Sequence, residues 1–300
     1  MLKGAVDFFW LFSLLAPAFM ALSNVVDNHV LHAHYNNPVS YAIVTTWLSL
    51  PIAVGIFLAR RVSFSFEAWF VGTAVGFFFA FLFILYTVAM MREQGANVVS
   101  VIYLSPLFVA VLAGMFLGER LYVVNYAGIL LLVASAFLGL YRRISTRNLA
   151  LGLILVYALA AAASRVVTKF ALESVDVWSY YFWFLVGGLL GSMVLAVAWR
   201  VSGRAVTKPD RPTLLLMVAT DAFSTVGLVL LYTAFSYGSV TLASGLTAIQ
   251  PSLVFVYSAV LLRLRPGAIP AERIAGRWAD VRKVGAAILI VAGALALIAV

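Results

Sequence analysis

The chain has 300 residues, of which 64% are hydrophobic and 10% are charged. Soluble domains carry about a quarter charged residues, so this composition excludes a sizeable soluble domain and predicts an integral membrane protein. The absence of cysteine excludes disulfides, thiolate zinc sites and iron–sulfur clusters. The net charge of +9 is explained by Lys and Arg in loops that meet anionic lipid headgroups, so it does not indicate a nucleic-acid partner.

Ten stretches are long and apolar enough to cross a membrane, which takes about 20 residues in a helix. Short links separate them, and these links are polar, basic or marked by Pro and Gly. The stretches are 8–31, 38–59, 69–91, 96–117, 121–141, 149–172, 177–199, 213–237, 240–262 and 284–299. We therefore predict an all-α membrane protein with ten transmembrane helices.

Three blocks of sequence recur in the same order in the two halves of the chain. The matched pairs are 21–26 with 162–167, 85–89 with 231–235, and the stretch from Gly95 with the stretch from Gly238. In the last pair, a small-residue helix reaches a single proline, Pro106 or Pro251. Self-similarity of this kind indicates duplication. We predict one five-helix repeat at 1–141, a linker loop at 142–148, and a second repeat at 149–300.

An odd number of spans in each repeat places the repeats in opposite orientations across the membrane. Inverted repeats are typical of transporters, with the substrate site near the midplane between the halves. The second repeat carries an insert at about 264–283, where Ile274, Trp278 and Val281 share a face. This insert is either an amphipathic helix at the membrane surface or a plain loop.

Small residues at a spacing of three or four predict close contacts between helices in lipid. The candidates are Gly72 with Gly76, Gly114 with Gly118, Ala160 with Ser164, and Gly187 and Gly188 with Gly191.

The two repeats resemble the EamA-type members of the drug/metabolite transporter superfamily. The resemblance is carried by Tyr103-Leu104-Ser105-Pro106, by Phe116-Leu117-Gly118-Glu119 and by the counterpart Ile249-Gln250-Pro251. The sequence departs from the pattern at Leu264, which stands where the first repeat has Glu119. The resemblance implies secondary transport, usually export of small metabolites and often coupled to protons. It also implies cytoplasmic termini, whereas the distribution of Lys and Arg favours termini outside.

Ionisable residues inside membrane spans are costly, and they therefore indicate function. Asp221 lies near the middle of the stretch 213–237, where it can exchange a coupling proton or bind a cationic group. Arg165 matches Asn24 of the first repeat and can hold a carboxylate with two hydrogen bonds. A structural ion pair between Arg165 and Asp221 or Asp27 is the alternative.

Further candidates surround the two prolines. Ser105 and Gln250 precede them, and a proline frees a backbone carbonyl about one turn earlier. Aromatic residues that can line a pocket or stack on a cation are Tyr86, Tyr103, Trp183 and Tyr232. His29, His32 and His34 lie at the end of the first stretch. We expect a hydrated loop there and no metal site, because the spacing lacks a clear helical pair.

The leading hypothesis is a secondary transporter that exports small metabolites such as amino acids by alternating access, with Asp221 coupling protons. The alternatives are a carrier for quaternary or cationic amines, a channel and a lipid scramblase. Motifs of hydrolases, metalloenzymes and nucleotide-binding proteins are absent, so we expect neither an enzyme nor a cofactor. The expected partners are a small-molecule substrate and membrane lipids. We expect a monomer or homodimer that passes repeatedly through the cell's inner (plasma) membrane.

Overall fold

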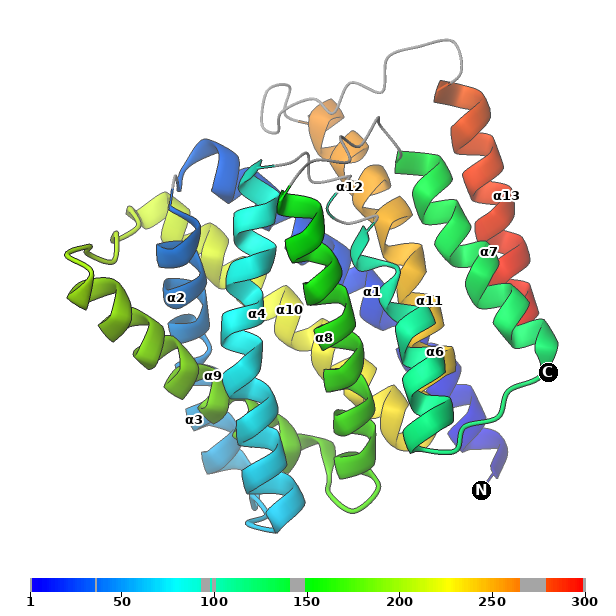
Figure 1. Ribbon diagram of the computed structural model, residues 1–300, viewed down its shortest axis with the longest axis horizontal. Helices are drawn as coiled ribbons and strands as arrows, with labels where there is room; N and C mark the ends of the chain where they lie inside the picture. The colour runs from blue at the N-terminus through cyan, green and yellow to red at the C-terminus, as the bar shows by residue number, and fades with distance from the viewer. Residues whose placement is uncertain are drawn as a thin grey trace.

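The structure is a computed structural model that describes residues 2–35, 37–92, 98, 101–140, 149–264 and 279–298. Within these ranges every regular element is a helix (Figure 1). The elements are α1 (Leu2–Ala33), α2 (Pro38–Leu48), α3 (Leu50–Ala59), η1 (Glu67–Val71), α4 (Gly72–Arg92), α6 (Ser105–Phe116), α7 (Val123–Leu140), α8 (Leu149–Leu172), α9 (Val177–Val201), α10 (Arg211–Tyr237), α11 (Val240–Leu246), η2 (Thr247–Ile249), α12 (Gln250–Leu264) and α13 (Ala279–Ile298).

Seven helical stretches of the described chain are long and apolar enough to cross a membrane. They are Val6–His32, Pro38–Ala59, Glu67–Arg92, Gly152–Leu172, Val177–Val201, Arg211–Tyr237 and Val240–Leu261. Three shorter apolar helices, Ser105–Phe116, Val123–Ser135 and Ile288–Ile298, lie within the other three predicted stretches. The all-α membrane fold is thus confirmed, and the full count of ten spans stays a prediction. Most of the insert at 264–283 lies outside the described residues, and its last part begins α13.

The helices of the two halves pack against each other in corresponding pairs. α1 runs along α10, and its counterpart α8 packs on α4. Likewise α1 contacts α12, and α8 contacts α6. α7 lies beside α13, the two last helices of the halves (Figure 1). In Figure 1 α1 rises from the marked N-terminus while α8 descends from the upper loops, as inverted repeats require.

The close helix contacts predicted at Gly76 and at Gly187 are confirmed, and the structure shows that these two glycine motifs face each other. A Cβ atom on Gly76 would lie 1.9 Å from the carbonyl oxygen of Phe184, and one on Gly187 would lie 2.0 Å from that of Thr73. Such distances leave no room for a side chain, so the backbones of α4 and α9 touch directly.

The predicted contact through Gly114 and Gly118 is wrong. Among the described residues, a Cβ on Gly114 would meet its nearest neighbour at 3.7 Å, and one on Gly118 would meet nothing within 4 Å. Gly118 instead adopts a φ of 66°, which turns the chain after α6. Ser164 donates a hydrogen bond to the carbonyl of Ala160 within α8, at 2.9 Å, and the contact of this pair with another helix stays a prediction.

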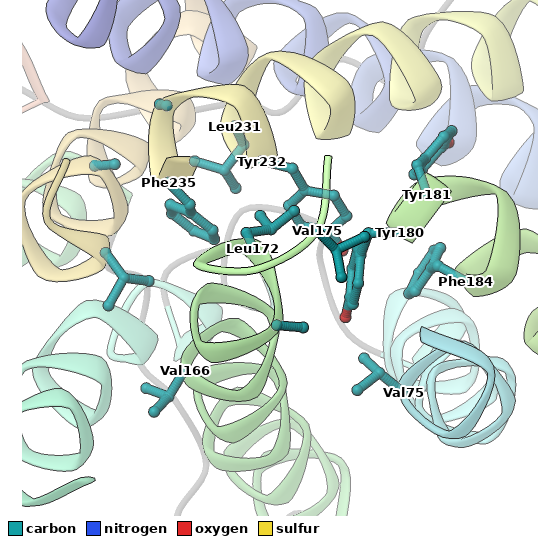
Figure 2. Packing of buried hydrophobic residues seen from close by; sticks show 14 of the residues in the cluster. Val75, Val166, Leu172, Val175, Tyr180, Tyr181, Phe184, Leu231, Tyr232 and Phe235 are labelled. Atoms are coloured by element: carbon teal, nitrogen blue, oxygen red, sulfur yellow. The ribbon is translucent and has the colours of Figure 1, made fainter. Parts of the chain in front are cut away.

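Tyrosines and phenylalanines fill the space between α8, α9 and α10. Figure 2 shows Tyr232 of α10 beside Tyr180 of α9, with Tyr181 on one side of this pair and Phe235 on the other. The rings of Tyr180 and Tyr232 meet edge to face, with their centroids 5.7 Å apart. The Tyr180 hydroxyl lies 2.7 Å from that of Thr168, so it stays hydrogen-bonded although it is buried. This cluster forms a rigid support for the cavities described next.

Candidate functional site

Two corresponding helices are interrupted where their prolines stand. In the first half a turn at Tyr103 and Leu104 precedes α6, which begins at Ser105-Pro106. In the second half the 3-10 helix η2 separates α11 from α12, which begins at Gln250-Pro251. Broken helices of this kind are tolerated in membranes where the freed backbone is covered by protein or lines a cavity.

A cavity of about 130 Å³ lies between these two interruptions. Five predicted site residues line it together: Asn24, Tyr86, Tyr103, Arg165 and Gln250. The Tyr86 hydroxyl donates to Oδ1 of Asn24 at 3.3 Å, and the Tyr86 ring stacks on Phe83 with centroids 5.6 Å apart. We call this space the arginine cavity.

Arg165 reaches the arginine cavity from α8 and is held by the second half's interruption. Its Nη1 donates to Oγ1 of Thr247, in η2, at 3.3 Å. Thr247 Oγ1 in turn donates to the carbonyl of Ser244 at 2.7 Å. A guanidinium has five N–H donors in a fixed plane, and this hydrogen bond occupies one of them. The group is therefore oriented and still able to bind an anion.

A second cavity, of about 100 Å³, contains Asp221 of α10. It adjoins the arginine cavity, because both are lined by Ser23, Asp27, Phe79, Phe83, Ser224 and Leu228. Hydroxyl groups of Thr45, Thr220 and Thr225 also line this space. We call it the aspartate cavity. Together the two cavities place one cation and two carboxylates around a single small chamber.

Asp27 was not among the predicted site residues, although it lines both cavities. It is 3% exposed, and its Oδ1 accepts a hydrogen bond from the Tyr41 hydroxyl. Because Asp27 lies near the end of the first predicted stretch, the sequence predicted that its carboxylate is hydrated. In the structure α2 folds back on α1, and Tyr41 covers this carboxylate. Tyr157 of α8 is a second unpredicted lining residue of the arginine cavity. An acidic residue inside an apolar stretch was the available signal for Asp27.

Three predicted site residues lie outside the lining of both cavities. Tyr232 is 5% exposed and packs within the aromatic cluster (Figure 2). Ser105 is buried beyond Tyr103, and no hydrogen bond reaches its hydroxyl from the residues the structure describes. Trp183 turns away, and its Nε1 donates to the carbonyl of Ser63 at 2.9 Å. Lys169 of α8 also lies outside both linings, and its Nζ donates to the carbonyl of Phe235 at 2.9 Å.

The histidines at the end of α1 lie apart from the chamber lining. The rings of His29 and His34 meet edge to face, with centroids 5.1 Å apart, and Nδ1 of His32 lies 3.0 Å from the carbonyl oxygen of Asn28. Among the described residues no group of three or more His, Asp or Glu side chains is arranged to hold a metal ion.

These features define a multi-pass membrane protein with a charged chamber enclosed between two related halves. The EamA-like transporter family matches the chain over residues 8–141 and again over residues 148–270. The chain therefore belongs to the EamA-like transporter family and is a membrane transporter of the drug/metabolite type.

A comparison with solved structures supports the same fold. One of them, described as "Crystal structure of protein", has a TM-score of 0.69 and 19% sequence identity. The match covers 98% of this chain and 96% of the other. No curated protein matches this chain in sequence.

Proposed function

We propose that the protein is a secondary transporter that exports small zwitterionic metabolites, amino acids first, by alternating access. One observation carries the proposal: Asp27 lines both cavities, with Arg165 in the wall of one and Asp221 in the wall of the other. An isolated charge in such a site is costly unless it is paired. A zwitterionic substrate offsets that cost twice, because its carboxylate pairs with Arg165 and its ammonium group pairs with an aspartate.

In this proposal the substrate carboxylate binds Arg165, which can donate two parallel hydrogen bonds. The ammonium group lies toward Asp27, whose carboxylate is already oriented by Tyr41. Cavities of about 130 and 100 Å³ lie below the range of roughly 300–1,000 Å³ that is usual for drug-sized ligands. The substrate is accordingly small.

Asp221 is the proposed proton carrier. Asp221 and Asp27 line the same cavity, and two negative charges in a poorly hydrated space repel each other strongly. An ammonium group at Asp27 relieves that repulsion, as does a proton on Asp221. The binding of substrate and the release of a proton are thereby linked. Rocking of one half against the other would carry the chamber from one side to the other.

Transport in proteoliposomes tests the proposal. The parent should take up labelled amino acids in counterflow, and a pH gradient should drive their net movement. Asp221→Asn should keep counterflow and lose the response to the pH gradient. Arg165→Gln should lose both. Asp7→Asn, at an exposed position at the start of α1, is the matched control and should behave as the parent. If a pH gradient drives amino acid movement by Asp221→Asn as fast as by the parent, Asp221 is not the proton carrier.

A second candidate is a carrier for cationic amines, which the tyrosines favour. Tyr86, Tyr103 and Tyr157 line the arginine cavity together with Asp27, and aromatic faces attract organic cations. Arg165 opposes this candidate because it would repel such a substrate. Arg165→Gln separates the two candidates: it should abolish amino acid transport, whereas it should leave or improve the transport of a quaternary amine.

A further inference from the structure

A third cavity, larger than those of the chamber, opens on the outer surface of the helix bundle. It has a volume of about 630 Å³ and lies at the C-terminal end of α9, against Trp47 of α2. It shares no lining residue with the arginine or the aspartate cavity. We call it the α9 groove.

The wall of the α9 groove is apolar along the membrane-spanning part of α9. Met193 and Val197 are 53% and 62% exposed, so they face lipid. Trp47 forms the opposite side, and its Nε1 donates to Oγ of Ser192 at 3.0 Å. This hydrogen bond fixes the indole at a set distance from α9. The groove therefore has an apolar part, formed by Met193, Val197 and Trp47, within the candidate span Val177–Val201; we call this part the slot.

The upper end of the α9 groove is basic. Arg200 lies in the last turn of α9, and Arg204 follows after the turn at Gly203, which has a φ of 76°. The Arg204 guanidinium stacks on the Trp199 ring, with Cζ 4.7 Å from its centroid. In the part of the chain that the structure describes, no carboxylate forms an ion pair with either arginine.

The segment that closes this end is tied down. The backbone N–H of Thr207 donates to Oγ of Ser40 at 3.2 Å, and the Tyr35 hydroxyl donates to the carbonyl of Thr207. These two bonds hold residues 203–207 against the start of α2. The two arginines therefore stand at a defined place above the apolar slot, at the level where spans end and headgroups begin.

We propose that the α9 groove binds one anionic phospholipid. Its phosphate lies between Arg200 and Arg204, and one acyl chain lies along Met193 and Val197 against Trp47. Guanidinium groups bind phosphate through paired charge-assisted hydrogen bonds, and a cation near a helix C-terminus is itself favoured. The apolar slot below distinguishes a lipid from a free phosphate ion, because only a lipid fills both parts.

Native mass spectrometry of the purified protein in detergent tests this proposal by titration with phosphatidylglycerol, phosphatidylcholine and inorganic phosphate. The parent should retain one phosphatidylglycerol molecule at least tenfold more tightly than phosphatidylcholine. A basic residue near a headgroup contributes about 1 kcal/mol, which is about fivefold in affinity. Arg200→Gln and Arg204→Gln should each weaken retention about fivefold, and the double variant about 25-fold.

Two further variants separate the charge from the slot. Arg60 follows α3 and stacks on Trp178, at the N-terminal end of α9, with Cζ 5.4 Å from the ring centroid. Arg60→Gln therefore removes an arginine far from the α9 groove. It is the matched control and should bind phosphatidylglycerol as the parent does. Ala196→Trp fills the slot and leaves both arginines, and it too should weaken phosphatidylglycerol binding. Equal binding of the two lipids, or parent-like binding by the double variant, would overturn the proposal. Displacement of the lipid by an equal concentration of inorganic phosphate would also overturn it.

Discussion

The Glu119 carboxylate accepts a hydrogen bond from the Ser239 hydroxyl at 2.7 Å, which joins the two halves of the protein. The same carboxylate accepts from the backbone N–H groups of Val240 at 2.9 Å and Thr241 at 3.2 Å. Glu119 thus satisfies two of the free donors at the start of α11 from outside that helix, and the Ser239 hydroxyl accepts from a third, the N–H of Leu242. The family resemblance singled out Glu119, and the structure gives a physical reason for a carboxylate there.

Replacing Glu119 by alanine should lower stability. Glu119→Ala leaves two backbone donors and one hydroxyl without their acceptor, and such losses cost about 1–3 kcal/mol. Thermal unfolding in detergent measures the effect. Ser239→Ala keeps the two backbone bonds to Glu119, but it also removes the hydroxyl that accepts from the backbone N–H of Leu242 at 3.2 Å, so both variants should melt below the parent. If Glu119→Ala and the parent have the same melting temperature, the three hydrogen bonds to Glu119 do not contribute to stability.

Close packing of α4 on α9 predicts a sharp dependence on glycine. Gly76→Ala and Gly187→Ala would bring a methyl group within about 2 Å of a backbone oxygen, and we expect a loss of about 1–3 kcal/mol from overpacking. Gly55→Ala and Gly152→Ala are matched controls, since nothing lies within 4 Å of a Cβ at either position. These controls should melt at or above the parent's temperature, because alanine favours helix.

Local pattern was sufficient for several features of this fold. Apolar stretches of the right length predicted the helices, and recurrent blocks predicted two related halves, whereas the pairing of α1 with α10 and of α4 with α8 came only from the structure. Gly76 and Gly187 predicted that their helices make close contacts, since only glycine allows backbones to approach so closely, but the sequence did not say which helices meet. Gly114 and Gly118 failed as a contact pair because the same spacing also arises where a helix ends in a glycine turn.

The chamber depends on contacts that no local pattern records. Asp27 is covered by Tyr41 because α2 folds back on α1, and Arg165 is oriented by Thr247 from the other end of its own half. Trp183 shows the converse, because its place in an apolar span says nothing of which side it faces. Its indole bonds to Ser63 and lies outside the lining of both cavities.

Tyr41 and Asp27 should act together in substrate binding. Tyr41→Phe removes the hydroxyl that orients the Asp27 carboxylate and leaves the ring in place, so we expect weaker substrate binding with the maximal rate nearly kept. Asp27→Asn removes the charge and should abolish transport of zwitterions. Initial rates in proteoliposomes at several substrate concentrations separate the two effects. Unchanged kinetics in Asp27→Asn would exclude contact between this carboxylate and the ammonium group.

The start of α10 predicts an acid-sensitive contribution to stability. Hydrogen bonds from Thr213 lower the pKa of Asp210 below its ordinary value, and its carboxylate caps the helix. The lowered pKa means that this contribution is present above about pH 4, the ordinary pKa of aspartate, and is lost as pH falls further. Asp210→Ala should therefore lower the melting temperature more at pH 7 than at pH 3. Asp210→Asn, which caps without titrating, should melt above Asp210→Ala at both pH values, and the difference between these two variants should change little with pH.

The position of the two chain ends tests the count of ten spans. Seven spans would leave the ends on opposite sides of the membrane, whereas ten would leave them on the same side. In Figure 1 both marked ends lie at the lower ends of their helices, toward the same part of the bundle.

Because the chain has no cysteine, single cysteines can be placed at each end and at Ser174 and Ser202. Labelling of intact vesicles with an impermeant reagent should place both ends and Ser174→Cys on one side and Ser202→Cys on the other. Ends on opposite sides would mean that at least one of the three shorter helices does not cross the membrane.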